Sequence, residues 1–171
     1  GLIPSISQSF NKNSSAIGQG VTVFTLFFSI SAPIFSTILA KSPVKKILVI
    51  AISVFTLANI ITAISMNYTV YIVSRAIAGL GAGVFSPIAI SASNHLVSEK
   101  HKGKAIAFTV GGMSVGTVIG VPLGLEISKL SNWRFAMLII IVISFIALIS
   151  ISIPVSYTHL TLPTKLRCRS R

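Results

Sequence analysis

Arg75 is the side chain with the clearest potential for chemistry, because it lies alone in a long uncharged stretch. It is the single Asp, Glu, Lys or Arg between Lys46 and Glu99. An arginine that faces hydrocarbon costs between about 2.5 and well over 10 kcal/mol, depending on depth. Its guanidinium must therefore face protein or water, where ionisable residues line pathways or relay protons. An arginine only seven residues past Tyr68 can also snorkel to the outer headgroups.

Other ionisable groups give weaker signals. Glu126 could pair with Arg75, but pairing with Lys129, one helical turn away, or exposure at the membrane surface is the favoured interpretation. His95 and His101 lie six residues apart with one Glu between them, which is a poor ligand set for a metal ion. We therefore expect a solvated loop there, with no metal site and no cofactor.

Ser114 lies in a Gly-x-Ser-x-Gly pattern that is typical of a hydrolase nucleophile elbow. That elbow needs a strand–turn–helix context together with histidine and acidic partners. Here the serine falls in the middle of an apolar run, and the chain contains no Asp. We therefore reject a catalytic triad and predict that the protein is not an enzyme.

The glycines around Ser114 belong to a longer ladder with four-residue spacing. Between Lys104 and Lys129 the chain runs for 24 residues with a single charge, and it carries Gly112, Gly116, Gly120 and Gly124, with Pro122 inside the last step. A glycine inside a water-exposed helix costs about 1 kcal/mol relative to alanine. The ladder therefore predicts a membrane helix that another backbone approaches closely.

The elements that position these residues are membrane-spanning helices. Only 9% of the residues are charged, 53% are hydrophobic and the mean hydropathy is +0.91, whereas soluble domains carry about 25% charged residues. Because a helix needs about 20 apolar residues to cross a bilayer, we predict an all-α integral membrane fold. Its five spans are residues 17–40, 44–66, 69–92, 105–128 and 135–154.

Two spans allow more detailed expectations. Ser14 or Ser15 is expected to cap the first span. The second span is rich in Ile, Val and Leu and holds only Asn59 as a strong polar group. We expect this span to face lipid and Asn59 to form a hydrogen bond between helices rather than a binding site.

The distribution of basic residues predicts the topology. The formal net charge of +12 comes from 14 Lys and Arg against two acidic residues. Six of these basic residues lie in the loops around residues 41–46 and 100–104, whereas the loop between them, around residues 67–68, has none. Since positive residues collect in short cytoplasmic loops, we place both basic loops inside, and we expect no nucleic-acid partner. Lys129 and Arg134 in the last loop weaken this asymmetry without reversing it.

The two ends of the chain suggest a fragment. The sequence starts abruptly at Gly1 without an initiator Met. Residues 156–171 have no periodicity and resemble translated sequencing-adapter read-through, and they hold Cys168, the one cysteine. We therefore assign residues 1–155 to a partial membrane domain and residues 156–171 to a non-native tail.

Several motifs together resemble the major facilitator superfamily, in particular its drug:proton antiporters and sugar-efflux permeases. The Arg-x-x-x-Gly-x-Gly signature of the family's fourth helix matches residues 75–81, and Gly83 follows. The fifth-helix glycine pattern, ending in Gly-Val-Pro-Leu-Gly, matches residues 112–124. The loop at 102–105 and Trp-Arg-Phe at 133–135 also fit. The resemblance covers residues 1 to about 154, as helices two to six of a six-helix N-terminal half.

The resemblance implies roles for individual residues. Arg75 would tune or relay a proton, and Gly79, Gly81 and Gly83 would bring the helix close to a neighbour. The ladder on the next span would seal it against another helix and suppress leak. The family's loop between helices two and three usually carries an Asp, which is absent here, while Lys45 and Lys46 keep its terminal basic pair and fit as topology and phosphate-headgroup anchors.

The function implied is secondary active transport, with proton-coupled efflux of a small drug-like or sugar-like compound by alternating access as the first hypothesis. An importer or facilitator of small metabolites on the same fold is the second, and a non-transporting helical scaffold is the third. The expected partners are a small-molecule substrate, protons, the lipid bilayer, and the missing first helix and C-terminal half of the same chain. The expected location is the cytoplasmic membrane of a bacterium, as a multi-pass protein.

Overall fold

The structure, a computed structural model, describes residues 3–39, 42–95, 101–130 and 132–153. These residues form six helices joined by short connections, without a β-strand among them. The helices are α1 (Ile3–Phe10), α2 (Ser14–Ile38), α3 (Val44–Ile64), α4 (Tyr68–His95), α5 (Lys102–Leu130) and α6 (Trp133–Ser152). The predicted tail at residues 156–171 lies outside the described residues.

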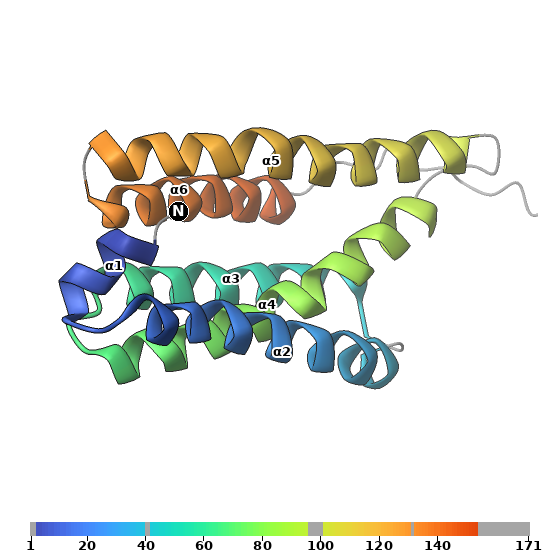
Figure 1. The fold of residues 1–171 in the computed structure, drawn as a ribbon. Coiled ribbons are helices and arrows are strands. Elements are labelled where there is room, and N and C mark those ends of the chain that lie inside the picture. The colour runs from blue at the N-terminus through green and yellow to red at the C-terminus, as the bar shows by residue number, and fades with distance from the viewer. Residues whose placement is uncertain (1–2, 40–41, 96–100, 131, 154–171) are drawn as a thin grey trace, which may run out of the picture.

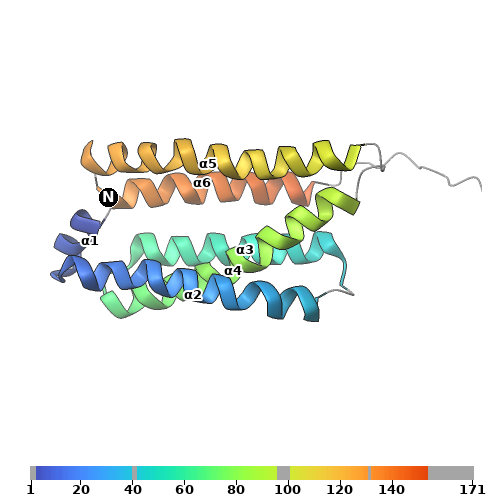
Figure 2. The same ribbon diagram turned by 45° about the vertical axis from the view of Figure 1, so that its right-hand side comes forward.

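The five long helices coincide with the five predicted spans. Each is long and apolar enough to cross a membrane, so the all-α membrane fold is confirmed. The short helix α1 precedes them. Figures 1 and 2 show α2, α3 and α4 side by side in one layer and α5 and α6 in a second. The layers meet where α3 packs against α6 and α4 packs against α5.

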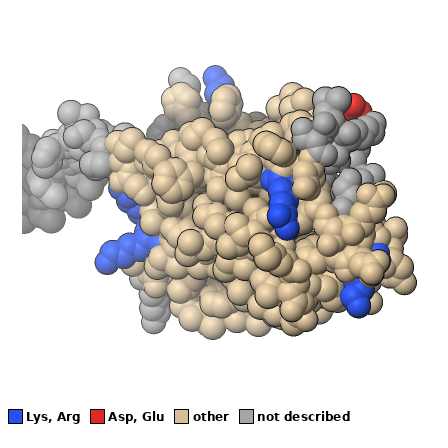
Figure 3. All heavy atoms as spheres, turned by 90° about the vertical axis from the view of Figure 1, so that its left-hand side faces the viewer, with Lys and Arg blue, Asp and Glu red and all other residues tan. Residues whose placement is uncertain are grey.

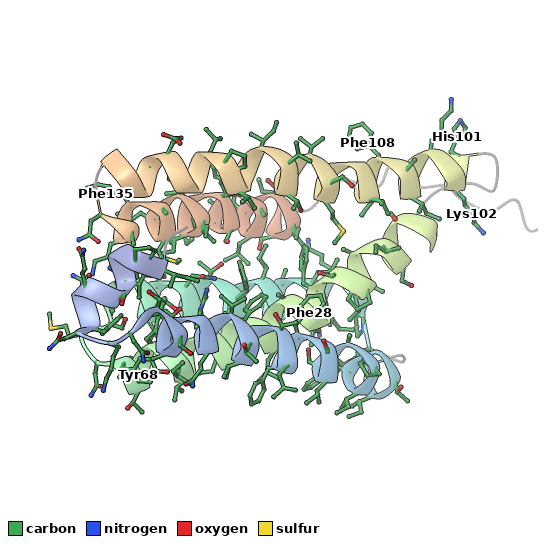
Figure 4. The ribbon with its side chains drawn as sticks, in the orientation of Figure 1. Phe28, Tyr68, His101, Lys102, Phe108 and Phe135 are labelled. Carbon is green, nitrogen blue, oxygen red and sulfur yellow. The ribbon has the colours of Figure 1, made fainter. Side chains whose placement is uncertain are left out.

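Successive helices run in opposite directions, so the bundle has two distinct ends (Figure 1). We call them the Tyr68 end, where α2, α4 and α6 begin, and the Lys45 end, where α3 and α5 begin. Figure 4 shows Tyr68 at the first end and His101 and Lys102 at the second. Seen from the Tyr68 end in Figure 3, the basic side chains lie apart from one another on a largely uncharged face.

Helix α3 is more central than its composition indicates. One face carries exposed aliphatic side chains, including Ile50, Leu57 and Ile64, as expected for a span that faces lipid. The opposite face is buried, and its members are Ile47, Ala51, Ile52, Thr56, Ala58, Asn59, Thr62 and Ala63. The prediction that this span faces lipid is therefore wrong for this buried face, which holds eight of the 21 residues of α3. Small side chains on the buried face let α4 and α6 pack against it.

Glycines allow α4 to approach both of its neighbours. A Cβ atom added at Gly79 would overlap the carbonyl oxygen of Phe24 in α2, and one added at Gly83 would overlap the carbonyl oxygen of Phe28. At Gly81 an added Cβ would lie 2.9 Å from the carbonyl oxygen of Ala51 in α3. The three glycines therefore lie where α4 meets α2 and α3.

An aromatic cluster closes the Tyr68 end. The ring of Phe10 lies 5.7 Å from that of Tyr71 and 6.0 Å from that of Trp133, between ring centroids. The indole Nε1 of Trp133 donates a hydrogen bond to Ser9 Oγ at 2.9 Å, which ties α1 to α6. Aromatic side chains with a polar tip are typical of the membrane–water interface.

The N-cap of α2 differs from the prediction. The cap is Asn13, whose Oδ1 accepts a hydrogen bond from the backbone N–H of Ala16 at 2.9 Å. Ser14, expected as a cap, is instead the first helical residue. Asparagine caps a helix as well as serine does. Because Asn13 comes one residue before Ser14, it takes the cap position and α2 begins at Ser14.

Candidate functional site

Arg75 points into the bundle and contacts α2 and α3. One terminal nitrogen, NH2, donates a hydrogen bond to Asn59 Oδ1 at 2.8 Å, and the guanidinium lies over the ring of Phe24, 5.6 Å from its centroid. The Nε atom is buried, and no described residue accepts a hydrogen bond from it. The side chain therefore faces protein, and the snorkelling interpretation does not describe it.

Asn59 is held so that its oxygen faces the arginine. Its side chain is 1% exposed, and its Nδ2 donates to the carbonyl oxygen of Phe55, one turn earlier in α3, at 2.8 Å. Because the amide nitrogen is bound to the backbone of its own helix, the amide oxygen is left for Arg75. The predicted hydrogen bond between helices at Asn59 is confirmed.

These side chains line a cavity of about 330 Å³. Its walls come from α1, α2, α3, α4 and α6. Three lining residues have polar side chains: Asn59 from α3, and Tyr71 and Arg75 from α4. The other lining residues are Ile3, Ile6, Ile17, Gly20, Val21, Phe24, Phe55, Met137 and Ile140. The cavity is thus an apolar chamber with a single cation in its wall.

Tyr71 and Phe24 are site residues that the sequence reasoning missed. Tyr71 lies one turn before Arg75, and its ring packs on Gly20 so closely that a Cβ there would lie 2.5 Å from Tyr71 Cε1. The four-residue spacing between Tyr71 and Arg75 was an available signal, since such residues share one helix face. The contact with Phe24 had no comparable signal, because it joins two different helices.

A second polar contact joins α3 and α4 near the arginine. Thr62 Oγ1 and Ser74 Oγ lie 2.8 Å apart, and both side chains are buried. Each hydroxyl also lies within hydrogen-bond distance of a carbonyl oxygen of its own helix, Thr62 Oγ1 of Ala58 at 2.9 Å and Ser74 Oγ of Tyr71 at 2.8 Å. The two helices are thus joined by polar contacts at two successive positions of α4.

The glycine ladder lies apart from this site. Nothing described lies within 4 Å of a Cβ added at Gly112, Gly116, Gly120 or Gly124, and Pro122 is exposed. The close approach of another backbone to the ladder therefore stays a prediction.

Ser114, which was rejected as a nucleophile, lies on α5, and the two histidines considered as metal ligands precede this helix in the sequence. Ser114 is exposed, and its hydroxyl donates to the carbonyl oxygen of Val110 at 3.1 Å within its own helix. The side chain of His95 lies outside the described residues, while His101 is exposed at the start of α5. Among the described residues no group of three or more His, Cys, Asp or Glu could hold a metal ion.

The remaining predicted residues lie toward the ends of the bundle. Lys45 Nζ donates a hydrogen bond to the carbonyl oxygen of Ser152 at 3.0 Å, at the C-terminus of α6, while Lys46 is exposed. Glu126 is exposed near the end of α5, and the side chain of Lys129 lies outside the described residues.

Comparison with known proteins gives one family. The family model described as Major Facilitator Superfamily matches residues 1–167. The chain is 29% identical over 159 residues to the uncharacterized MFS-type transporter YbcL of Bacillus subtilis (strain 168), which covers 93% of this chain and 41% of the relative. It is also 29% identical over 167 residues to YtbD of the same strain, an uncharacterized MFS-type transporter, covering 98% and 40%.

A more distant relative is the putative transporter AraJ of Escherichia coli (strain K12), 22% identical over 151 residues, which covers 88% of this chain and 38% of the relative. The chain thus spans about two fifths of the length of the curated relatives that it matches.

Proposed function

The chain belongs to the Major Facilitator Superfamily, and on that premise we propose that it forms part of a secondary active transporter. In this proposal α2 to α6 are helices two to six of an N-terminal six-helix half, and the first helix and the C-terminal half come from the rest of the protein. The substrate is a small drug-like or sugar-like compound, exported in exchange for protons by alternating access. The names of YbcL and YtbD, both MFS-type transporters, and of the putative transporter AraJ support the transport part of this proposal.

The observation that carries the proposal is Arg75 in the cavity wall. A cation held by a neutral amide within a membrane favours the charged form of any carboxylate brought next to it. Such a carboxylate would take up and release its proton according to its distance from Arg75, as proton coupling requires. The carboxylate is to be sought in the rest of the protein, since neither Asn59 nor Tyr71 can supply it.

The ladder on α5 supports export over import. The resemblance to efflux permeases rests on residues 112–124, and the open face of the ladder accommodates a closely packed helix. We propose that this helix belongs to the other half of the protein and that the contact prevents leak. Lys45 and Lys46 serve as anchors at the cytoplasmic surface. In this proposal the protein lies in the cytoplasmic membrane of a bacterium, and the bacterial organisms of the three relatives support the bacterial origin.

Export is tested with the full reading frame that contains this chain, expressed in a drug-sensitive bacterial host. Wild-type protein is expected to raise resistance and to drive proton-dependent accumulation of the compound in inside-out vesicles. Arg75→Ala is expected to lose both, because the cation that tunes the proton site is gone. Lys104→Ala, which removes an exposed cation outside the cavity, is the control. If the Arg75→Ala protein is present in the membrane and retains proton-dependent accumulation, the role of Arg75 is wrong.

A further inference from the structure

We propose that Arg134 is a positioning residue for Arg75 and that it acts through helix α3. This proposal rests on the proposed function only in taking Arg75 as the residue that is served. Three observations carry it. Arg134 lies where its charge is unfavourable for its own helix, its side chain binds the end of α3, and buried polar side chains lead from that end to Asn59, the partner of Arg75.

The position of Arg134 is unfavourable for α6 itself. Arg134 is the second residue of this helix, directly after Trp133, and a cation in the first turn opposes the helix dipole. It also lies at the Tyr68 end of the bundle, where Figure 4 shows its neighbour Phe135. Positive residues in short loops collect on the cytoplasmic side, which the basic loops place at the opposite end. We therefore looked for a part of the molecule outside α6 that the side chain stabilises.

The side chain of Arg134 binds the C-terminus of α3. Its NH2 atom donates a hydrogen bond to the carbonyl oxygen of Ser65, the C-cap residue of α3, at 3.1 Å. The last carbonyl groups of a helix have no partner within the helix and form the negative end of its dipole, so a cation there is stabilising. The guanidinium also lies over the ring of Trp133, 5.5 Å from its centroid, and Trp133 is fully buried. Arg134 thus joins the first turn of α6 to the end of α3.

Buried polar side chains lead from this contact to the arginine site. Asn59, Thr62 and Ser65 follow one another at three-residue spacing, and none is more than 2% exposed. Ser65 Oγ donates to the carbonyl oxygen of Thr62 at 2.7 Å, and Thr62 Oγ1 lies 2.8 Å from Ser74 Oγ in α4. One turn earlier in α3, Asn59 Oδ1 accepts the hydrogen bond from Arg75. Helix α3 is therefore tied to α6 at its end and to α4 at the next two polar positions.

The contact with Arg134 fixes α3 along its own axis. Asn59 lies six residues before Ser65, which is about 9 Å along a helix, and a helix is rigid enough to carry a displacement over that length. Normal N–H···O distances end at about 3.2 Å. An axial displacement of α3 by roughly half an ångström would therefore take the contact between Asn59 and Arg75, now 2.8 Å, beyond that limit. Loss of Arg134 is expected to weaken the hold on Arg75 without removing either partner.

The test is a double-mutant cycle on the full-length protein in detergent, read as the midpoint of thermal unfolding. Asn59→Ala removes the hydrogen bond to Arg75 and is expected to lower this midpoint in the wild-type background. In an Arg134→Met background, which has neither the charge nor the donor, the same change is expected to lower it by less than half as much, because the contact is already weakened. Arg134→Lys, which keeps a cation and a donor, is expected to restore the full effect of Asn59→Ala.

Lys12→Met is the matched control background, because Lys12 is an exposed cation at the same end whose contact is with the ring of Tyr68 in α4. Asn59→Ala is expected to keep its full effect there. If Arg134→Met does not elute as a single peak on size-exclusion chromatography, the neutral and shorter Arg134→Gln replaces it with the same expectation.

Equal effects of Asn59→Ala in all backgrounds would overturn the proposal, because changes at independent sites more than about 7–10 Å apart add. A smaller effect that lysine does not restore would overturn it as well. The cycle involves no transport, so its outcome is separable from that of the proposed function. Additive changes in a protein that exports with protons would refute the positioning role and leave transport intact. Coupled changes in a protein whose export is independent of protons would support the positioning of Asn59 and refute the proton coupling assigned to Arg75.

Discussion

Replacing Gly81 by alanine is expected to push α4 away from α3. The new Cβ would lie 2.9 Å from both the carbonyl oxygen of Ala51 and the backbone nitrogen of Phe55, whereas ordinary van der Waals contact begins at 3.4 Å. Both atoms belong to the backbone of a helix, so no side-chain rotation relieves the overlap. The helices must separate locally by about 0.5 Å, the difference between these two distances.

That separation affects the polar contacts between the same two helices. The bonds from Thr62 to Ser74 and from Arg75 to Asn59 are each 2.8 Å long, and about 0.5 Å more would bring them to the upper limit of normal hydrogen bonds. Overpacking costs about 1–3 kcal/mol, and alanine regains up to about 1 kcal/mol over glycine in a helix. We expect a net loss in the free energy of unfolding of about 1 kcal/mol.

The measurement is the midpoint of thermal unfolding of the full-length protein in detergent, followed by circular dichroism at 222 nm. Gly18→Ala is the matched control, because nothing described lies within 4 Å of its added Cβ; it gains helix propensity without overlap. Gly81→Ala should melt below the wild type and Gly18→Ala at or above it. If the two variants melt together, Gly81 does not mark a close contact between α3 and α4, and the packing argument fails.

Two further changes test the ends of the bundle. Lys45→Ala removes the hydrogen bond from Nζ to the carbonyl oxygen of Ser152, and a cation at a helix C-terminus contributes about 0.3–1 kcal/mol. The midpoint of thermal unfolding should therefore fall in Lys45→Ala but not in the control Lys46→Ala. Equal midpoints of the two variants would contradict the contact. In a background without native cysteines, Asn67→Cys should react with a membrane-impermeant maleimide in intact cells and Ser42→Cys only after lysis, because basic loops stay inside; the reverse pattern would invert the topology.

The extent of the helices could be predicted well from the sequence. Each of the five spans begins and ends within three residues of a predicted bound, because long apolar runs between charged loops are the requirement for crossing a bilayer. The short helix α1 was not predicted as a separate element. Eight residues are too few for a periodic pattern to distinguish a helix of its own from the end of a preceding one.

The neighbours of each helix could be predicted only in part. A glycine pattern indicates that a helix can be approached, but it does not indicate which helix approaches. The glycines at 79, 81 and 83 meet α2 and α3, whereas those at 112, 116, 120 and 124 meet no described residue. Arg75 was correctly expected to face protein or water, because placing its charged side chain in hydrocarbon costs too much free energy. Its partners Asn59 and Phe24 come from two other helices, and the sequence carries no signal that selects them.

The exposed state of α5 bears on how the protein is assembled in the membrane. No residue in the most apolar 18-residue stretch of α5 is buried within the described bundle, whereas 44% of the residues in the corresponding stretch of α3 are buried. Membrane helices insert first and associate afterwards, so α2, α3 and α4 can associate as soon as α4 has left the insertion machinery. Helix α5 lies outside this core of three helices and contacts α4 and α6. If the glycine ladder packs against a helix of the C-terminal half, as proposed above, docking of α5 would be completed only after that half is synthesised.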